Sequence, residues 1–352
     1  MDLRTKLLIG GEWLDGRDRF ATVNPATEEV IAEVEEAGAA EVDAAVRSAR
    51  DAFEDPAWRD LDPHRRAALL WRLADLVEET LEFIAELESR DTGKPAFESA
   101  RVDLPFVVSN FRYFAGWADK RAGDVIPVSG PFLIYTLREP LGVIGAIIPW
   151  NFPLNIASWK LAPALACGNA VILKPAEETP LTALLLGELA LEAGFPPGIV
   201  NVIPGRGPVT GQAMVEPPGI DKIAFTGSTE TGRVVMKTAA ESLKKVSLEL
   251  GGKSPNVVFA DADLKAAVRG AITGIFYGKG EVCAAGSRLF VEASIKDEFM
   301  EQLASKAAGM TVGDPNHPKT RLGAIVSKGQ HERVLSYIEA GIAEGATLRT
   351  GG

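Results

Sequence analysis

The stretch that decides the fold lies near the middle of the chain, where residues 141–153 read LGVIGAIIPWNFP. Within it, Val143–Ile148 is short, has no polar residue and is followed by proline, which is typical of a strand buried on both faces of a sheet. The longer segment Leu141–Trp159 carries no charge, but the prolines and asparagines inside it argue against a membrane-spanning helix. We therefore expect a buried strand followed by an irregular, functional loop.

Similar short apolar runs follow this strand along the chain. They are Ala170–Leu173, Ile199–Ile203, Ile223–Phe225 and Val246–Leu250. Helical patterns separate them, from Thr179 to Gly194 and from Ser228 to Ala240. This alternation predicts an α/β fold with a doubly wound parallel sheet. It continues beyond residue 251 and ends with an expected strand at Ala346–Leu348.

The chain before residue 141 predicts an N-terminal hairpin, helices and a ribbon. Leu7–Trp13 contains two adjacent glycines and reads as a small hairpin. Asp62 followed by Pro63 opens a long helix that we expect to end near Gly93, and another helix is expected over residues 98–121. The proline-flanked segment Ile126–Glu139 suits an extended ribbon at an edge or on an excursion.

Composition excludes several classes of protein. The 352 residues include 37 Lys and Arg against 48 Asp and Glu, a net charge of −11 without a polybasic tract, so nucleic acid and membrane surfaces are poor candidate partners. Two cysteines exclude a disulfide scaffold and fit a reducing compartment, while three scattered histidines do not suggest a metal site. The N-terminus has no apolar signal core, so we expect a cytoplasmic protein.

The two cysteines differ in their surroundings. Cys167 lies in an apolar stretch before a strand and reads as a small buried hydrophobic residue. Cys283 is flanked by glycines and other small residues, which let a substrate approach its sulfur closely. Cys283 is therefore the candidate nucleophile, since a thiolate is the best protein nucleophile near neutral pH, and a thiol in a tight turn is the alternative.

A single carboxylate interrupts one of the apolar runs. Glu249 lies in Val246–Leu250 and would be paired, protonated or functional if that strand were buried. A general base with a raised pKa fits this position. An edge strand whose alternate residues, Ser247 and Glu249, face water remains the alternative.

Two further segments follow strands and suit a nucleotide. Gly227 and Ser228 open a helix after Ile223–Phe225, and Gly232 follows within it, so that free N–H groups could bind a pyrophosphate; a plain capped helix is the alternative. Lys174 and Glu177 stand at the end of another strand, where an acidic residue can bind a ribose diol; Lys174 could also be a solvated strand end.

Taken together, these features resemble the aldehyde dehydrogenase superfamily, in its NAD(P)-dependent, acid-forming branch. The resemblance spans nearly the whole chain and is carried by Pro149–Pro153, Trp159-Lys160 with Pro163–Leu165, Lys174–Glu177, Phe225–Gly232, Glu249–Pro255 and Gly280–Arg288. It implies that residues 1–250 form a dinucleotide-binding domain, with an oligomerisation-type excursion over residues 122–140. Residues 251–352 would be the first part of an incomplete α/β catalytic domain.

The resemblance also implies a mechanism. Cys283 would attack an aldehyde to give a thiohemiacetal, with the Asn151 amide and the Cys283 backbone N–H forming an oxyanion hole. Hydride transfer would leave a thioester, and Glu249 would activate the water that hydrolyses it. Lys160 would lie on the nicotinamide side of the site. Glu281 departs from the glutamine usual at this position, and we expect it to point away from the thiol.

The implied cofactor is NAD, with NADP possible. Ile148, Pro149 and Trp150 would supply backbone and shape contacts, and Lys174 and Glu177 would face the adenosine ribose. Gly227, Ser228 and Gly232 would approach the pyrophosphate. A carboxylate near the ribose 2′ position accepts a hydroxyl and repels a phosphate, so Glu177 favours NAD.

The resemblance further predicts a small aldehyde as substrate and a homo-oligomer, dimer or tetramer, as the full-length assembly. Related chains continue beyond the position of Gly352, so we expect a C-terminally truncated chain. An alternative function is therefore an aldehyde-dehydrogenase-like protein that binds cofactor but is catalytically weak or inactive. Acyl transfer to coenzyme A is a further alternative, which Glu249 argues against because such relatives generally lack the base.

Overall fold

A seven-stranded sheet forms the body of the computed structural model, which describes residues 3–351. Its order is β11 (Lys245–Leu250), β10 (Lys222–Gly227), β7 (Val143–Ile147), β8 (Ala170–Lys174), β9 (Val200–Val202), β1 (Leu7–Ile9) and β2 (Glu12–Leu14). The five strands from β11 to β9 are parallel, which confirms the predicted α/β fold. The chain runs from β7 to β8 and β9 on one side and then to β10 and β11 on the other. Ligands of such sheets bind where the strand order reverses, here at the carboxyl ends of β7 and β10.

The N-terminal hairpin belongs to this sheet, so the sheet is mixed rather than wholly parallel. Strand β1 pairs antiparallel with both β9 and β2. Its three residues are fully or almost fully buried, because they cover the edge that β9 would otherwise leave open. Gly10 and Gly11 form the turn with φ of 62° and 82°, values that a side chain disfavours.

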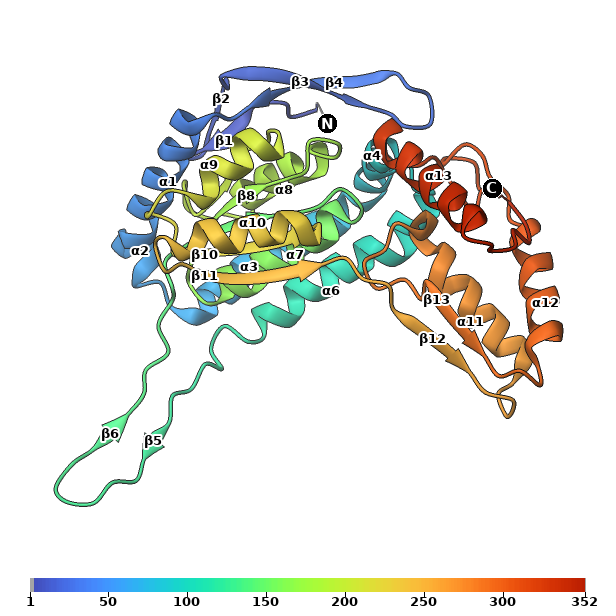
Figure 1. The fold of residues 1–352 in the computed structure, drawn as a ribbon. Helices are drawn as coiled ribbons and strands as arrows, with labels where there is room; N and C mark the ends of the chain where they lie inside the picture. Colours follow the sequence, from blue (N-terminus) through green and yellow to red (C-terminus); the bar gives the residue numbers. More distant parts are fainter. Residues whose placement is uncertain (1–2, 352) are drawn as a thin grey trace.

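Helices pack against the sheet in two groups (Figure 1). One group contains α1 (Ala39–Glu54), the short α9 (Gln212–Val215) and α10 (Thr229–Ala240). The other contains α3 (Pro63–Glu79), α4 (Leu81–Thr92), α6 (Leu104–Ala115), α7 (Pro153–Ala166) and α8 (Leu181–Glu192). The short helix α2 (Pro56–Arg59) follows α1. Together the sheet and helices enclose one continuous hydrophobic core.

Two of the expected helices are divided or shorter than predicted. The helix that Asp62 caps ends at Thr80, whose hydroxyl donates to Leu76 O at 2.7 Å, and α4 then continues to the left-handed Gly93. The next helix consists of α5 (Ala96–Glu98), a π turn over Ser99–Asp103 and α6, and it ends at Ala115 rather than Arg121. Side-chain hydrogen bonds and local turns, which the apolar periodicity does not report, set these ends.

Two hairpins lie outside the sheet. Strands β3 (Asp18–Val23) and β4 (Val30–Glu36) form one of them. Strands β5 (Val125–Ile126) and β6 (Ile134–Tyr135) form the other, a long arm that projects from the body (Figure 1). The arm confirms the extended ribbon expected at this position, and its apolar side chains are exposed.

Residues after Leu250 form a smaller α/β unit. Strand β12 (Pro255–Val258) pairs in parallel with β13 (Arg288–Val291), and α11 (Leu264–Phe276), α12 (Lys296–Ala308) and α13 (Lys328–Ala343) accompany them. Its separate hydrophobic core has four buried residues, Val258, Val268, Ala271 and Phe299. The strand expected at Ala346–Leu348 is wrong: this segment has no strand partner among the described residues. Within the described part of the chain, every helix is too short or too polar to cross a bilayer.

Candidate active site

The loop after the central strand leads directly into a helix. Strand β7 ends at Ile147, and Ile148 donates its N–H to Lys174 O at 3.0 Å, which ties the loop to the end of β8. The irregular segment is shorter than expected, because Pro153 takes the first position of α7, where its missing N–H has no cost. Pro149, Trp150 and Asn151 are therefore held at the carboxyl end of the sheet, as the sequence predicted.

The Cys283 loop has an unusual backbone. Gly278, Lys279 and Gly280 have φ of 56°, 62° and 80°, three successive left-handed residues, one of which is not glycine. Such a turn is costly for Lys279 and needs support from its surroundings. Beyond it, the Cys283 thiol is free and exposed, so a substrate could reach the sulfur.

Asn151 and the Cys283 loop are in direct contact. The Asn151 side-chain amide donates to Glu281 O at 2.7 Å. Since a primary amide has two N–H donors, this bond orients the group and leaves the second donor for another acceptor. The structure thus brings together two predicted site residues that are far apart in the sequence.

The segment after β11 also reaches the nucleophile loop. A Cβ on Gly252 would lie only 3.5 Å from Cys283 O, so the turn that follows Glu249 passes beside the cysteine. Glu249 itself is exposed on β11, which is an edge strand of the sheet. Of the two readings that the sequence left open, the edge strand is therefore the one observed, because no further strand covers β11 among the described residues.

Lys160 and Glu249 face the same cavity. It has a volume of about 550 Å³ and lies between α7 and the strands β10 and β11. Burial lowers the pKa of Lys160 to about 8, while the Glu249 carboxylate acts in the opposite direction. Cys167 lines this cavity as well and is only partly buried, so its interpretation as a buried hydrophobic residue is wrong. Its position at the end of α7, which periodicity alone does not fix, explains the difference.

Glu281 is held by neighbours on several segments. Its carboxylate lies 2.9 Å from Lys279 Nζ and accepts the Val326 N–H at 3.2 Å. Lys279 also donates to Thr92 O at 2.6 Å and to Ala324 O at 2.7 Å. Sequence reasoning missed this role of Lys279, which binds its neighbour Glu281 and two distant segments at Thr92 and Ala324.

The glycine-rich segment after β10 is a capped helix start. Ser228 Oγ accepts the Thr231 N–H at 3.0 Å, which satisfies one of the free donors of α10. A Cβ on Gly227 would lie 2.5 Å from the Phe225 ring, and one on Gly232 would lie 2.7 Å from the Leu250 side chain. Packing therefore explains both glycines without a ligand, while the remaining N–H groups of the helix start could still receive a phosphate.

Lys174 and Glu177 lie together at the end of β8. Lys174 Nζ donates to Pro175 O at 2.7 Å and is 3.9 Å from a Glu177 carboxylate oxygen. Burial lowers the pKa of Lys174, with Glu177 opposing. On β10, which β7 separates from β8, Thr226 Oγ1 is buried without a hydrogen-bond partner among residues 3–351, and it lines the cavity of Lys160 and Glu249 instead. An ammonium and a partly exposed carboxylate at the end of β8 fit the polar parts of a dinucleotide.

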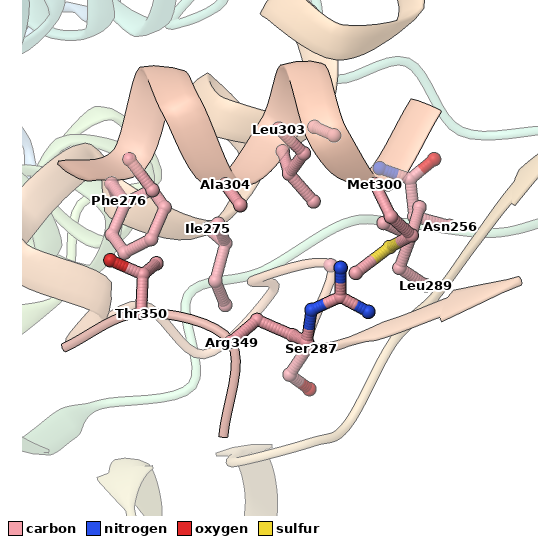
Figure 2. A pocket seen from close by; sticks show the side chains of 13 residues that line it. Asn256, Ile275, Phe276, Ser287, Leu289, Met300, Leu303, Ala304, Arg349 and Thr350 are labelled. Carbon is pink, nitrogen blue, oxygen red and sulfur yellow. The ribbon is translucent and has the colours of Figure 1, made fainter. Parts of the chain in front are cut away.

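A second, mostly apolar pocket lies elsewhere. It has a volume of about 250 Å³ between β12, β13, α11 and α12, with Arg349 and Thr350 beside it (Figure 2). None of the predicted site residues lines it. The contacts between predicted site segments are those of Asn151 with Glu281 O and of Gly252 with the Cys283 backbone.

Comparisons with known proteins show the family to which the chain belongs. The sequence profile described as Aldehyde dehydrogenase family matches residues 13–352. Human retinal dehydrogenase 2 is 51% identical over 99% of this chain and 68% of its own length. The putative aldehyde dehydrogenase DhaS of Bacillus subtilis is 50% identical over 99% of this chain and 70% of its own length. An NAD+ complex of aldehyde dehydrogenase from Bacillus cereus superposes with a TM-score of 0.97 at 48% identity, covering 99% of this chain and 71% of that one. The chain belongs to the aldehyde dehydrogenase family.

Proposed function

We propose that this protein oxidises an aldehyde to a carboxylic acid with NAD as the cofactor. One observation carries the proposal: the Asn151 amide is fixed on the carbonyl of Glu281, two residues before the exposed thiol of Cys283. A nucleophile with an oriented amide donor beside it is the minimum that attack on a carbonyl requires.

The first step uses Cys283 and Asn151. The Cys283 thiolate attacks the aldehyde carbon, a carbon–sulfur bond forms, and the carbonyl oxygen becomes the alkoxide of a thiohemiacetal. The second N–H of Asn151 and the backbone N–H of Cys283 donate to that oxygen. Removal of one such donor costs about 10²–10³ in kcat in comparable sites.

The second half of the reaction uses Glu249. Once the aldehyde carbon is oxidised, the acyl group remains on Cys283 as a thioester. Glu249, at the end of β11 and exposed to solvent, takes a proton from the water that attacks this thioester. Lys160 faces Glu249 across the same cavity and supports the charged carboxylate.

The cofactor would lie across the carboxyl ends of β7, β8 and β10. Ile148, Pro149 and Trp150 would contact it through backbone and shape, Lys174 and Glu177 would bind the adenosine ribose, and the start of α10 at Gly227, Ser228 and Gly232 would receive the pyrophosphate. When bound, NAD supplies the hydride acceptor. NADP would bind more weakly than NAD, because the Glu177 carboxylate repels a 2′-phosphate.

The same proposal covers the organisation of the protein. We divide the chain at residue 250 into a cofactor-binding domain and a catalytic part. The arm over residues 122–140 presents exposed apolar side chains, which suits assembly into a homo-oligomer. A nucleophilic thiol must stay reduced, so we place the protein in the cytoplasm.

A thioester trapped in a Glu249→Gln variant tests the proposal. With NAD and an aldehyde, this variant should make NADH in a single burst and retain an acyl mass on Cys283, whereas the wild type should turn over. Short aliphatic, aromatic, betaine and semialdehyde substrates would be compared. Steady turnover in Glu249→Gln would remove Glu249 from the mechanism, and an acyl-coenzyme A product on addition of coenzyme A would replace hydrolysis by acyl transfer.

A further inference from the structure

A buried cluster of charges lies beneath the proposed active site. Lys94, Glu88 and Asp103 are each at most 2% exposed. Lys94 Nζ lies 2.6 Å from Asp103 Oδ2 and 3.7 Å from Glu88 Oε1. The three residues come from the end of α4, the turn after it and the π turn before α6. None of them takes part in the mechanism proposed above.

The cluster holds one aromatic residue from each side of the site. Lys94 Nζ lies 4.1 Å from the centre of the Phe152 ring, a cation–π contact that burial strengthens. The Tyr277 hydroxyl donates to Asp103 Oδ1, the second oxygen of the same carboxylate. The Phe152 and Tyr277 rings are stacked, with centroids 5.9 Å apart and planes at 29°. Lys94 thus joins two aromatic residues that are distant in the sequence.

These two residues adjoin the proposed catalytic groups. Phe152 follows Asn151 directly, and the Glu88 carboxylate accepts the Leu154 N–H of the same segment at 3.4 Å. Tyr277 precedes the left-handed turn that leads to Cys283, and Glu98 accepts the Gly278 N–H at 3.1 Å. A movement of either segment would change the position of the amide relative to the sulfur.

Stability does not account for such a cluster. The carboxylates of Glu88 and Asp103 flank the Lys94 ammonium, Glu98 lies near both Lys94 and the buried Lys279, and burial raises the pKa of Glu88 and of Glu98 to about 7. Glu88 Oε1 has no hydrogen bond among the described residues. Replacement of buried ion pairs by apolar residues is often neutral or stabilising, so an arrangement of this kind calls for another role.

We propose that Lys94 is a positioning residue for the reaction: paired with Asp103, its ammonium holds Phe152 and Tyr277 together and so sets the Asn151 amide against Cys283. The inference rests on the proposed roles of Asn151 and Cys283. Since a displacement of about 1 Å can lower a rate by about 10²-fold, loss of this contact should weaken oxyanion stabilisation without loss of the thiol.

Two reactions of the same sulfur separate positioning from thiol reactivity. p-Nitrophenyl acetate acylates Cys283 through a tetrahedral oxyanion and releases p-nitrophenolate, whereas iodoacetamide alkylates it without an oxyanion. Neither reaction needs NAD or an aldehyde. In a Cys167→Ala background, which leaves one thiol, the ratio of the acylation rate to the alkylation rate reports on the oxyanion hole alone.

Tyr277→Phe is the decisive variant, because it keeps the stacked ring and removes only the hydroxyl bond to Asp103. We expect it to lower the ratio by about tenfold, and Lys94→Met to lower it further if that variant folds. Lys244→Met, which removes an ammonium bound to Pro217 O at 2.6 Å near the opposite end of β11, should leave the ratio unchanged. An unchanged ratio in folded Tyr277→Phe would overturn the inference.

A double-mutant cycle with Asn151→Ala excludes a merely structural role. If Tyr277 and Lys94 act through the amide, Tyr277→Phe should cause no further loss once Asn151 is alanine. If Tyr277→Phe lowered the acylation-to-alkylation ratio equally with and without the Asn151 amide, the inference would also be overturned. NAD-linked aldehyde oxidation by the wild type would be measured in parallel, and its absence would count against the proposed function, since the acylation ratio does not depend on it.

Discussion

The parts of the chain before and after residue 250 differ in how well they are packed. In the first part, strands β7 and β8 are buried throughout and a continuous core fills both faces of the sheet. In the second, four buried residues form the core, α13 buries none of its residues, and Phe259 and Phe290 are 62% and 54% exposed. The body of the protein therefore buries a large core, whereas the second part buries a small one.

This difference explains how the proposed site is held. Asn151, Lys160 and Glu249 come from the well-packed body, and Cys283 comes from the thinly packed part. Contacts to the body fix the cysteine loop: Asn151 binds Glu281 O, Lys279 binds Thr92 O and Tyr277 binds Asp103. The position of the nucleophile therefore depends more on these anchors than on the small core behind it.

The largest expected effect is loss of the thiol that the second part supplies. Cys283→Ala should lower aldehyde oxidation by at least about 10³-fold, because no other group can form the thioester. Cys167→Ala, the matched control in the body, should change the rate by no more than about twofold. Iodoacetamide labelling followed by peptide mass analysis would check the assignment, which fails if Cys167 is the fast-reacting thiol.

A core substitution in each part tests the packing difference itself. Phe299 and Phe111 are both fully buried, so each change to alanine should cost about 3–5 kcal/mol in unfolding free energy. Phe111→Ala should destabilise the whole body. Phe299→Ala should unfold only residues after Leu250, since its core touches little else.

Hydrogen exchange with mass analysis would show which segments open. We expect α11, α12 and β12–β13 to lose protection in Phe299→Ala while β7 and β8 keep theirs. Equal loss of protection throughout the chain would show that the two parts unfold together, which would contradict separate unfolding of the less well packed part.

The sequence predicts the body better than the second part, for the same physical reason. Buried strands such as Val143–Ile147 have an unmistakable apolar pattern, and the cap at Asp62 is local. The prediction of a strand at Ala346–Leu348 was wrong, because a strand needs a hydrogen-bonded partner strand and no local sequence pattern specifies one. The prediction of one continuous helix from Asp62 to Gly93 was wrong at Thr80, because the apolar periodicity does not report a side-chain bond such as that from Thr80 to Leu76 O.

For the site, the local sequence indicated Cys283 and Glu249 and the resemblance supplied Asn151, but their contacts could not be predicted. The bond from Asn151 to Glu281 O joins residues 130 positions apart. Lys94 carries no local signal at all: a lysine after a helix-ending glycine normally reads as solvated, and only the fold places it between Glu88 and Asp103.

A smaller effect concerns the charge on Lys160 in the body. Its folded-state pKa of about 8 lies below its ordinary value of 10.5, so the native state binds this proton less tightly than the unfolded chain. Between these two pH values the unfolded state holds more protons, and the unfolding free energy should rise with pH. Below about pH 8 the buried ammonium is a constant destabilising contribution.

Lys160→Met removes the titrating ammonium, and with it the dependence of the unfolding free energy on pH that Lys160 causes. The wild type is therefore compared with this variant at each pH. The difference in unfolding free energy between wild type and variant should shift in favour of the wild type from pH 8 to 10.5, as measured by urea titration. Lys237→Met, which replaces an exposed lysine of α10, controls for the loss of a lysine outside the cavity. If the difference in unfolding free energy did not change with pH, Lys160 would be solvated, and the cavity that it shares with Glu249 would be open to water.

The smallest expected effect is confined to the body and concerns the choice of cofactor. Glu177 lies 3.9 Å from Lys174 at the end of β8, and its side chain is 37% exposed. A carboxylate there accepts a ribose 2′-hydroxyl and repels a 2′-phosphate, by about 1 kcal/mol at 4 Å in water. Glu177→Gln should therefore narrow the preference for NAD over NADP by about fivefold, as measured by fluorescence titration of each cofactor.

The alkylation rate of Cys283 in Glu177→Gln should not change, because the second part of the chain is not involved. Equal affinity of the wild type for both cofactors, unaltered in Glu177→Gln, would show that the ribose does not bind at this strand end.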